Sequence, residues 1–159
     1  MAEYNPTPLK AARSVAAPDG WAPAAQFDPF EAYLGPFFER WAGEAHEFAF
    51  LLDDRHMNAK NVAHGGALMT FADAVMGYCV WDATERSPCV TVSQQTNFLS
   101  SAVVGELVAC RPLVIRKTRE IIFVRGDFQV GECAVFTATS IWKVFAKAGT
   151  VRNFVWRAG

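Results

Sequence analysis

Hydrophobic and polar residues recur with two different periods along this chain, and the changes of period divide it into elements. Within residues 44–53, EAHEFAFLLD, a period of two predicts a β-strand whose one face carries His46, Phe48, Phe50 and Leu52. Residues 65–82 instead place apolar side chains at helical spacing on every side. Because a helix that is apolar all round is typically buried, we expect a strand, a polar loop over residues 53–61, and a buried helix.

Strand-like patterning returns after this helix. It predicts four long strands with turns at Gly105, near Thr118 and at Gly131, over residues 89–99, 105–117, 119–130 and 132–147. A further run, residues 150–156, is a candidate edge strand. Short turns imply antiparallel pairing. The simplest packing is therefore an α+β fold in which an antiparallel sheet wraps around one long helix.

The N-terminal part of the chain has a different character. Residues 1–25 are rich in Ala and Pro and lack a period, which predicts an extended or disordered leader before a single domain over residues 26–159. A chain of 159 residues is long enough for one domain with a substantial core. At the start of that domain, Asp28 and Pro29 are typical of the beginning of a short helix, which Gly35-Pro36 should end.

Composition and charge narrow the function classes. Lys and Arg number 15 and Asp and Glu 16, so there is no basic field that would favour nucleic acid. The longest apolar run, near residues 67–81, is too short to span a bilayer and contains Asp73. The N-terminus lacks the basic-then-apolar order of a signal peptide. We therefore expect a cytoplasmic protein without a nucleic-acid or membrane partner.

Cysteine and histidine usage gives no sign of a metal centre. The four cysteines are widely spaced, without a CxxC pair, as is typical of small core residues in a reducing compartment: Cys79, Cys89, Cys110 and Cys133. The chain has only three histidines, so a zinc site is not expected. We expect no cofactor.

The buried helix carries the main candidate chemistry. Gly65 and Gly66 lie at its start, where free N–H groups attract a phosphate or the oxyanion of a polarised carbonyl, although tight packing of the helix start explains such glycines equally well. Asp73 follows eight residues after Gly65. A buried, unpaired carboxylate is costly, so Asp73 either reaches water or an arginine, or faces a subunit interface or substrate cleft as a general base or nucleophile.

Polar residues before and after the helix extend the candidate set. Asn58 is either a turn residue or an amide that holds a water or a carbonyl. Asn61 suits a left-handed backbone position. His64 is either a structural hydrogen-bonding residue near the helix N-cap or a catalytic base, and Thr91 supplies a strand hydroxyl.

Taken together, residues 56–77, HMNAKNVAHGGALMTFADAVMG, resemble the PaaI-like (phenylacetate-pathway) hotdog-fold acyl-CoA thioesterases. The family pattern is an Asn, a Gly three residues later, HGG three residues after that, and an Asp nine residues beyond the His. This chain has Asn58, His64-Gly65-Gly66 and Asp73 at those spacings, and departs from the pattern at Asn61. Residues 91–117 also look like the corresponding family strands, and the resemblance covers about residues 27–147.

The resemblance implies a hotdog fold, in which a five- or six-stranded antiparallel sheet wraps one long helix. It also implies a homodimer or a dimer-of-dimers homotetramer with active sites at subunit interfaces, and hydrolysis of acyl-CoA. Asp73 matches the residue that activates water or attacks the thioester. Gly65 matches the backbone donor to the carbonyl, and Asn58 an orienting amide from the neighbouring subunit. His64 matches a residue supporting the turn, and Thr91 a hydroxyl that places the water.

Other functions on the same fold stay open. A hotdog hydratase or dehydratase would place a histidine within the helix, where this chain has none. A non-catalytic acyl-CoA-binding module would not need Asp73. Tyr78 and Trp81, with Phe71 and Met76, either line an acyl pocket or pack in the core.

Coenzyme A phosphates require cations at the cleft. The densest basic cluster is Arg116, Lys117 and Arg119, which together with Gly66 forms the candidate substrate-binding set. The alternative is that these three residues form a solvated turn whose charges discourage edge pairing.

Overall fold

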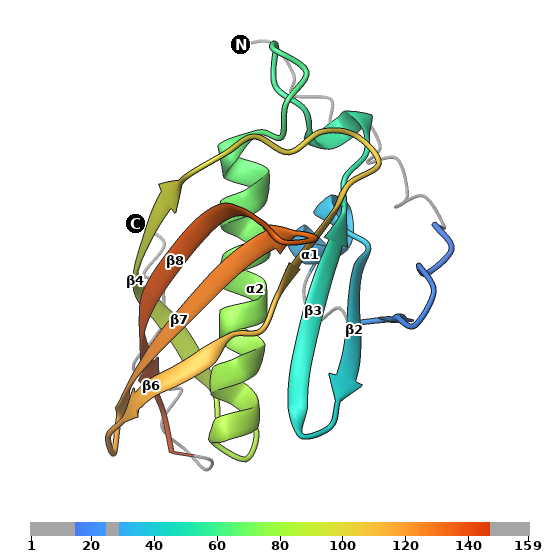
Figure 1. The fold of residues 1–159 in the computed structure, drawn as a ribbon. Coiled ribbons are helices and arrows are strands. Elements are labelled where there is room, and N and C mark those ends of the chain that lie inside the picture. Colours follow the sequence, from blue (N-terminus) through green and yellow to red (C-terminus); the bar gives the residue numbers. More distant parts are fainter. Residues whose placement is uncertain (1–14, 25–28, 147–159) are drawn as a thin grey trace, which may run out of the picture.

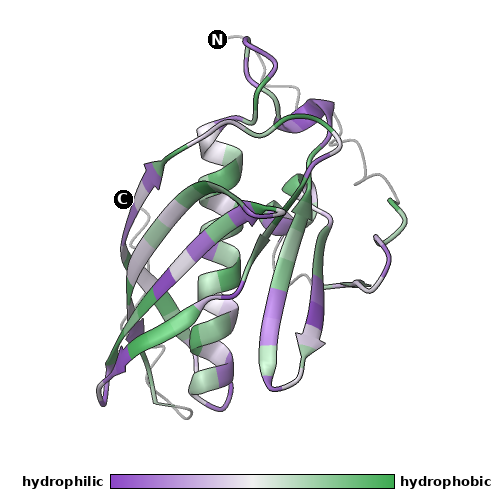
Figure 2. Cartoon of the chain, viewed as in Figure 1, coloured by the Kyte–Doolittle hydropathy of each residue, from purple (hydrophilic) through white to green (hydrophobic). Residues whose placement is uncertain are grey.

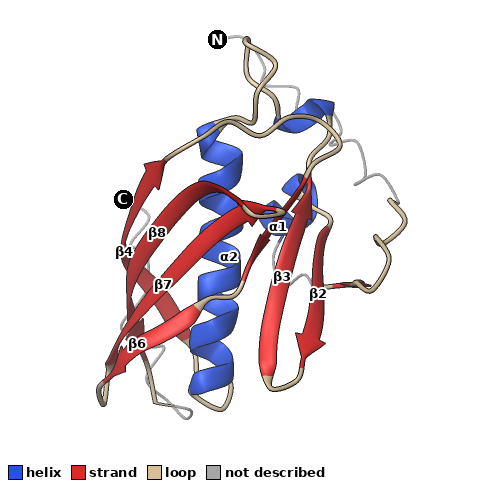
Figure 3. Ribbon diagram, in the orientation of Figure 1, coloured by secondary structure: helices blue, strands red, loops and turns tan. Residues whose placement is uncertain are grey.

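One long helix lies against a curved antiparallel sheet (Figures 1 and 3). The structure is a computed structural model that describes residues 15–24 and 29–146. Helix α2 runs from Gly65 to Ala83, close to its predicted bounds. The other helical elements are short, namely α1 (Pro29–Leu34) and the 3₁₀ turn η1 (Asp54–His56). This arrangement confirms the predicted α+β fold.

The sheet contains eight strands within the described residues. Their order is β1-β2-β3-β5-β7-β8-β4, and β6 pairs with β7 outside this path. All pairings are antiparallel. The strands are β1 (Ala22–Pro23), β2 (Phe37–Ala42), β3 (Ala45–Leu51), β4 (Cys89–Phe98), β5 (Leu107–Cys110), β6 (Leu113–Lys117), β7 (Ile121–Val130) and β8 (Cys133–Val144).

Two local features give the sheet more strands than expected. The predicted strand over residues 105–117 is divided into β5 and β6 around Pro112, because proline has no N–H for the ladder. Residues 37–42, for which the sequence predicts no strand, form β2; its first two residues are both buried, which hides the period of two. The candidate strand over residues 150–156 and the candidate cap Asp28 lie outside the described residues.

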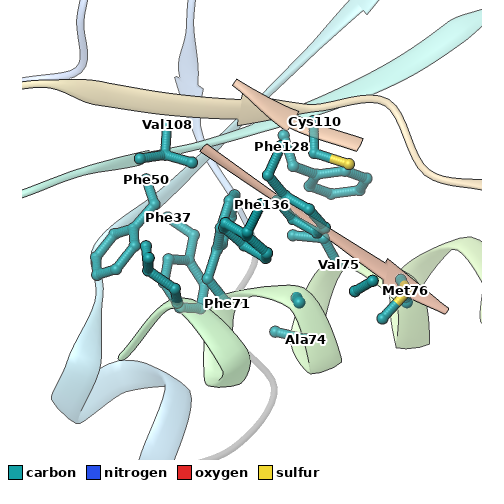
Figure 4. Packing of buried hydrophobic residues seen from close by; sticks show 14 of the residues in the cluster. Phe37, Phe50, Phe71, Ala74, Val75, Met76, Val108, Cys110, Phe128 and Phe136 are labelled. Carbon is teal, nitrogen blue, oxygen red and sulfur yellow. The ribbon is translucent and has the colours of Figure 1, made fainter. Parts of the chain in front are cut away.

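Phenylalanine side chains fill much of the space between α2 and the sheet (Figure 4). The ring of Phe71 lies 5.1 Å from that of Phe37, 5.4 Å from Phe50 and 5.6 Å from Phe128, measured between centroids. Phe128 stacks on Phe136 at 4.0 Å. Such pairs contribute roughly 0.5–1.5 kcal/mol each beyond the burial of their area. This aromatic core fixes the position of α2 relative to the sheet.

One stripe of α2 is not fully covered by the sheet, although the helix is largely apolar along its length (Figure 2). Partly or fully exposed residues recur every three or four positions, the spacing of one helix face. We call this face the open stripe: Gly66, Met69, Asp73, Gly77 and Trp81. Asp73 therefore lies beside the core, at the boundary between the packed interior and the outside.

A buried histidine fixes the loop before α2. His56 is 1% exposed, and its Nδ1 accepts the N–H of Asp53 at 2.9 Å. Its Nε2 lies 2.8 Å from the carbonyl of Leu34, to which it donates. Its own carbonyl accepts the N–H of His64 at 2.7 Å. Burial lowers the pKa of His56 below its ordinary value of 6.5, more than its contacts with Leu34 and Asp53 raise it, so the neutral ring joins α1, η1 and the start of α2.

We expect the free energy of unfolding to fall as the pH is lowered below about 6.5. Because the folded-state pKa of His56 is lowered, the unfolded chain takes up this proton first. The contribution of neutral His56 is therefore complete above the unfolded pKa and is lost as the pH falls toward the folded one. Urea unfolding between about pH 8 and pH 5 measures the slope, which His56→Gln should reduce. An unchanged slope in that variant, or an equal reduction in the exposed control His64→Gln, would contradict this role.

Candidate active site

The loop that precedes α2 contains a tight turn that begins at Asn58. The Asn58 N–H donates to the Val62 carbonyl at 2.8 Å, and its side-chain oxygen accepts the N–H of Lys60 at 2.8 Å. Asn61 has a φ of 58°, which confirms the predicted left-handed position and explains why asparagine is tolerated there. Within one chain Asn58 is thus a turn residue, whose amide NH₂ reaches no acceptor in residues 15–24 and 29–146.

The start of α2 leaves one backbone donor available. His64 is the N-cap, and its Nδ1 accepts the N–H of Gly66 at 2.9 Å. The N–H groups of Ala67 and Leu68 donate to the carbonyl of His64. The N–H of Gly65 donates to no acceptor within the described part of the chain. An N–H at a helix N-terminus that has no intrahelical partner can bind a carbonyl oxygen that gains negative charge.

Phe98, at the end of β4, lies over Gly65. Its ring atom Cζ is 3.0 Å from where a Cβ on Gly65 would lie, closer than most real Cβ contacts. Any larger residue at position 65 would have to displace this ring. The glycine therefore has a local packing reason in addition to its available N–H.

Asp73 is held by a hydroxyl from the sheet. The Thr91 Oγ1 donates to Asp73 Oδ1 at 2.8 Å, from β4 to the middle of α2. Asp73 is half-buried. The structure thus brings together Asp73 and Thr91, two residues that were singled out from separate parts of the sequence.

A β-bulge in β4 makes this contact possible. Thr91 pairs with Trp142 of β8, and Ser93 pairs with the next residue, Ile141, so Val92 is the extra residue. The bulge shifts the side-chain alternation by one position, so that Thr91 and Gln94 both face α2. The Gln94 side-chain NH₂ donates to the Met69 carbonyl at 3.0 Å, one helical turn before Asp73. Two polar side chains of β4 therefore hold the segment of α2 that carries the carboxylate.

A cavity of about 600 Å³ lies beside this pair. Four elements line it, through Asp73, Gly77 and Trp81 of α2, Thr91 of β4, Trp142 of β8 and Glu31 of α1. The volume lies in the range typical of small-molecule sites. Tyr78 also lines the cavity, whereas Phe71 and Met76 are fully buried in the core. A half-buried carboxylate on the wall of such a cavity can act as a general base or a nucleophile.

The thiol beside the carboxylate is a poor nucleophile. Cys89 lines the same cavity, where burial, and secondarily the charge of Asp73, raises the pKa of its thiol. Only the thiolate is strongly nucleophilic, so the carboxylate is the better candidate. Among the described residues, no group of three or more His, Cys, Asp or Glu side chains is arranged to hold a metal ion.

The predicted site residues fall into two groups within one chain. Asp73 and Thr91 form the first, and Asn58, His64 and Gly65 form the second, at the N-terminus of α2. Gly65 and Asp73 are eight residues apart, which corresponds to about 12 Å along a helix. One bound carbonyl cannot contact the N–H of Gly65 and the carboxylate of Asp73 in the same chain.

The basic cluster lies away from the cavity. Lys117 donates to the carbonyl of Ala83 and so caps the C-terminal end of α2. Arg116 lies in β6, and Arg119 lies in the turn that follows. Ala83 is ten residues beyond Asp73, or about 15 Å along the helix. None of the three basic residues lines the cavity beside Asp73.

Sequence reasoning missed Glu31, Trp142 and Gln94. Glu31 belongs to a six-residue helix with no pattern that links it to α2. Trp142 lies in a strand whose apolar face resembles any core strand. Only the bulge between Thr91 and Ser93 brings Gln94 to the helix side. No signal in a single sequence predicts these three contacts, because each depends on tertiary pairing.

Comparison with known proteins identifies the family of this chain. Residues 60–136 match the family model of the Thioesterase superfamily. A candidate esterase of Pseudomonas aeruginosa, PA0474, is 31% identical over 127 residues, which cover 79% of this chain and 95% of that protein. No helix among the described residues is both long and apolar enough to cross a membrane.

Solved structures share the fold. Conserved protein PA5202 of P. aeruginosa has a TM-score of 0.69 at 20% identity, over 75% of this chain and 95% of that one. A hypothetical thioesterase of Streptococcus pneumoniae, solved with coenzyme A, has a TM-score of 0.64 at 18% identity, over 71% of this chain and 88% of that one. A variant of the phenylacetic acid degradation protein PaaI of Thermus thermophilus has a TM-score of 0.63 at 22% identity, over 74% of this chain and 100% of that one. The predicted resemblance is therefore confirmed: this chain belongs to the thioesterase superfamily and has its hotdog fold.

Proposed function

We propose that this protein hydrolyses acyl-CoA thioesters to the free acid and coenzyme A. The observation that carries the proposal is the half-buried carboxylate of Asp73, held by Thr91 on the wall of a cavity in a thioesterase-superfamily chain. The pneumococcal thioesterase of the same fold was solved with coenzyme A, which supports this substrate class.

Hydrolysis of a thioester requires few catalytic groups. A thioester has weak resonance and a good leaving group, so one base and one oxyanion donor suffice. Asp73 either removes a proton from the attacking water or attacks the carbonyl carbon itself, and the Gly65 N–H stabilises the oxygen as it becomes negative. The thiolate of coenzyme A then leaves and takes up the proton that came from water. When Asp73 is the nucleophile, the acyl group first stays on it as an anhydride, which water hydrolyses to the free acid and the carboxylate. The Thr91 hydroxyl holds the carboxylate in one orientation, and His64 maintains the turn that aims the Gly65 N–H.

The separation of the two residue groups favours an active site shared between two copies. About 12 Å of helix separates the Gly65 N–H from Asp73 in one chain, whereas a reacting carbonyl must touch both. Asn58, His64 and Gly65 of one copy would therefore meet Asp73 and Thr91 of another. In this arrangement the Asn58 amide orients the water or the carbonyl.

The surface along β4 supports this assembly. β4 is a ten-residue edge strand in the described sheet, and such an edge is a template for pairing unless it is covered. Val92 is 58% exposed on it, and Phe98, over Gly65, is 50% exposed. Pairing two β4 edges would cover this apolar surface and bring the two α2 helices close together.

Asp73→Asn should lower kcat at least about 100-fold, because the amide keeps the shape but cannot act as a base or carboxylate nucleophile. Hydrolysis of acyl-CoA thioesters measures the loss. The matched control is Asp82→Asn on the same helix, whose carboxylate contacts His46 and does not line the cavity. Near-native turnover in the folded Asp73 variant would remove this residue from the mechanism.

Assembly should be required for activity. Sedimentation should give a dimer or a dimer of dimers of the 17.5 kDa chain. Val92→Glu on β4 should weaken the assembly and lower activity with it, because the new charge would be buried in the pairing. The control is Ile115→Glu on β6, also highly exposed at 61%, which should keep at least a dimer and its activity. A fully active monomer would rule out the shared site.

Arg116 and Arg119 are the candidates for contacts with the coenzyme A phosphates. Because they lie far from Asp73 in one chain, the coenzyme A must either extend along the surface to them or contact them on a second copy. Changing both to Ala, while Lys117 keeps its bond to Ala83, should raise KM for acyl-CoA more than it lowers kcat. The effect should shrink as salt rises. A thioester that lacks the nucleotide should be unaffected. Equal losses with both substrates, or none, would place the phosphates elsewhere.

A further inference from the structure

The cavity beside Asp73 extends in one direction along α2. Its helix wall continues from Asp73 through Gly77 to Trp81, eight residues or about 12 Å of rise. Its strand wall continues from Thr91 toward Pro88. On the proposed function, a thioester carbonyl at Asp73 and Thr91 places the acyl group in this space.

Trp142 forms the inner wall of the space. It pairs directly with Thr91 across β8 and β4, and it is 5% exposed, between the cavity and the core. Neighbouring side chains on one face of an antiparallel pair lie roughly 4.5–5.5 Å apart at Cβ. The indole is therefore the first side chain next to the catalytic pair in the direction of the core.

Two buried hydrogen bonds fix the indole. Its Nε1 donates to Ser140 Oγ at 2.7 Å, and Ser140 Oγ donates to the sulfur of Met76 at 3.3 Å. Rotation of the ring would leave a buried donor unpaired, which is unfavourable. The wall is thus held from both the sheet and the helix.

Gly77 gives the indole its place against α2. A Cβ at position 77 would lie 2.9 Å from Cη2 of Trp142, inside any real contact distance. Gly77 lies one helical turn beyond Asp73 on the open stripe. Gly77 and Trp142 are therefore in close contact, and together they separate the cavity from the buried side chains between α2 and the sheet.

We propose that Trp142, seated against Gly77, is the residue that limits acyl length, so that the protein takes compact acyl groups and excludes long chains. This rests on the proposed thioesterase function and adds the substrate class to it. With a smaller side chain at position 142, the space that the indole vacates would deepen the pocket toward the core and accommodate a longer acyl chain. With a methyl group at position 77, the displaced indole would fill part of the cavity.

The two residues allow changes in opposite directions. Wild-type kcat/KM, measured over straight-chain substrates from acetyl- to dodecanoyl-CoA, should fall toward the long end. Trp142→Leu should raise the ratio of long-chain to short-chain kcat/KM by about 10-fold or more, because one methylene group in an apolar pocket typically changes kcat/KM by at least this factor. Gly77→Ala should move the limit toward shorter chains. Phe128→Leu, a buried core change away from the cavity, controls for loss of stability, and should leave the preference unchanged.

Binding separates this inference from the proposed function. Calorimetric affinities for non-hydrolysable thioether analogues of the same acyl series report chain length without turnover. Absence of hydrolysis with a length limit in binding that moves in the two variants would overturn the thioesterase proposal and retain the wall. An unchanged length preference in both variants, or the same change in Phe128→Leu, would overturn the role of Trp142.

Discussion

The fold is organised around the need to bury α2. The helix is apolar on nearly all sides, so the chain must surround it, and no single flat sheet can do so. The sheet curves around the helix, and Phe71, Phe128 and Phe136 fill the space between them. What the sheet leaves uncovered is one stripe, and Asp73 lies on it. The same packing that buries the helix therefore determines where a carboxylate can be partly desolvated and still accessible.

Two separate sets of hydrogen bonds position the polar groups around this helix. At its N-terminus, the neutral His56 ties the preceding loop to α1, and His64 takes the N–H of Gly66, so the N–H of Gly65 has a fixed direction. In its middle, Thr91 and Gln94 hold the helix from β4. Neither set of hydrogen bonds brings the N–H of Gly65 and the carboxylate of Asp73 together within one chain. The helix acts as a rigid spacer, and in the proposed shared site the two groups meet only when the helix of a second copy lies beside the first.

The sequence predicts what local pattern and spacing determine. The bounds of α2 follow from apolar residues at helical spacing, and the left-handed position of Asn61 follows from its place in a tight turn. Pairing between distant segments could not be predicted in the same way. β2 was missed because Phe37 and Phe38 are both buried, and the break at Pro112 went unrecognised inside an apolar run. Glu31 and Trp142 reach the cavity only through tertiary packing, which one sequence does not encode as a period.

The bulge at Val92 divides β4 into two segments, and the alternation of side chains in one is shifted by one residue relative to the other. The segment before it faces the cavity through Thr91, and the segment after it hydrogen-bonds to the helix through Gln94. Deletion of a single residue here would leave a regular ladder with β8, yet it would turn Thr91 to the outer face and separate it from Asp73. A sequence alignment through β4 that ignores the bulge would compare residues on opposite faces of the sheet.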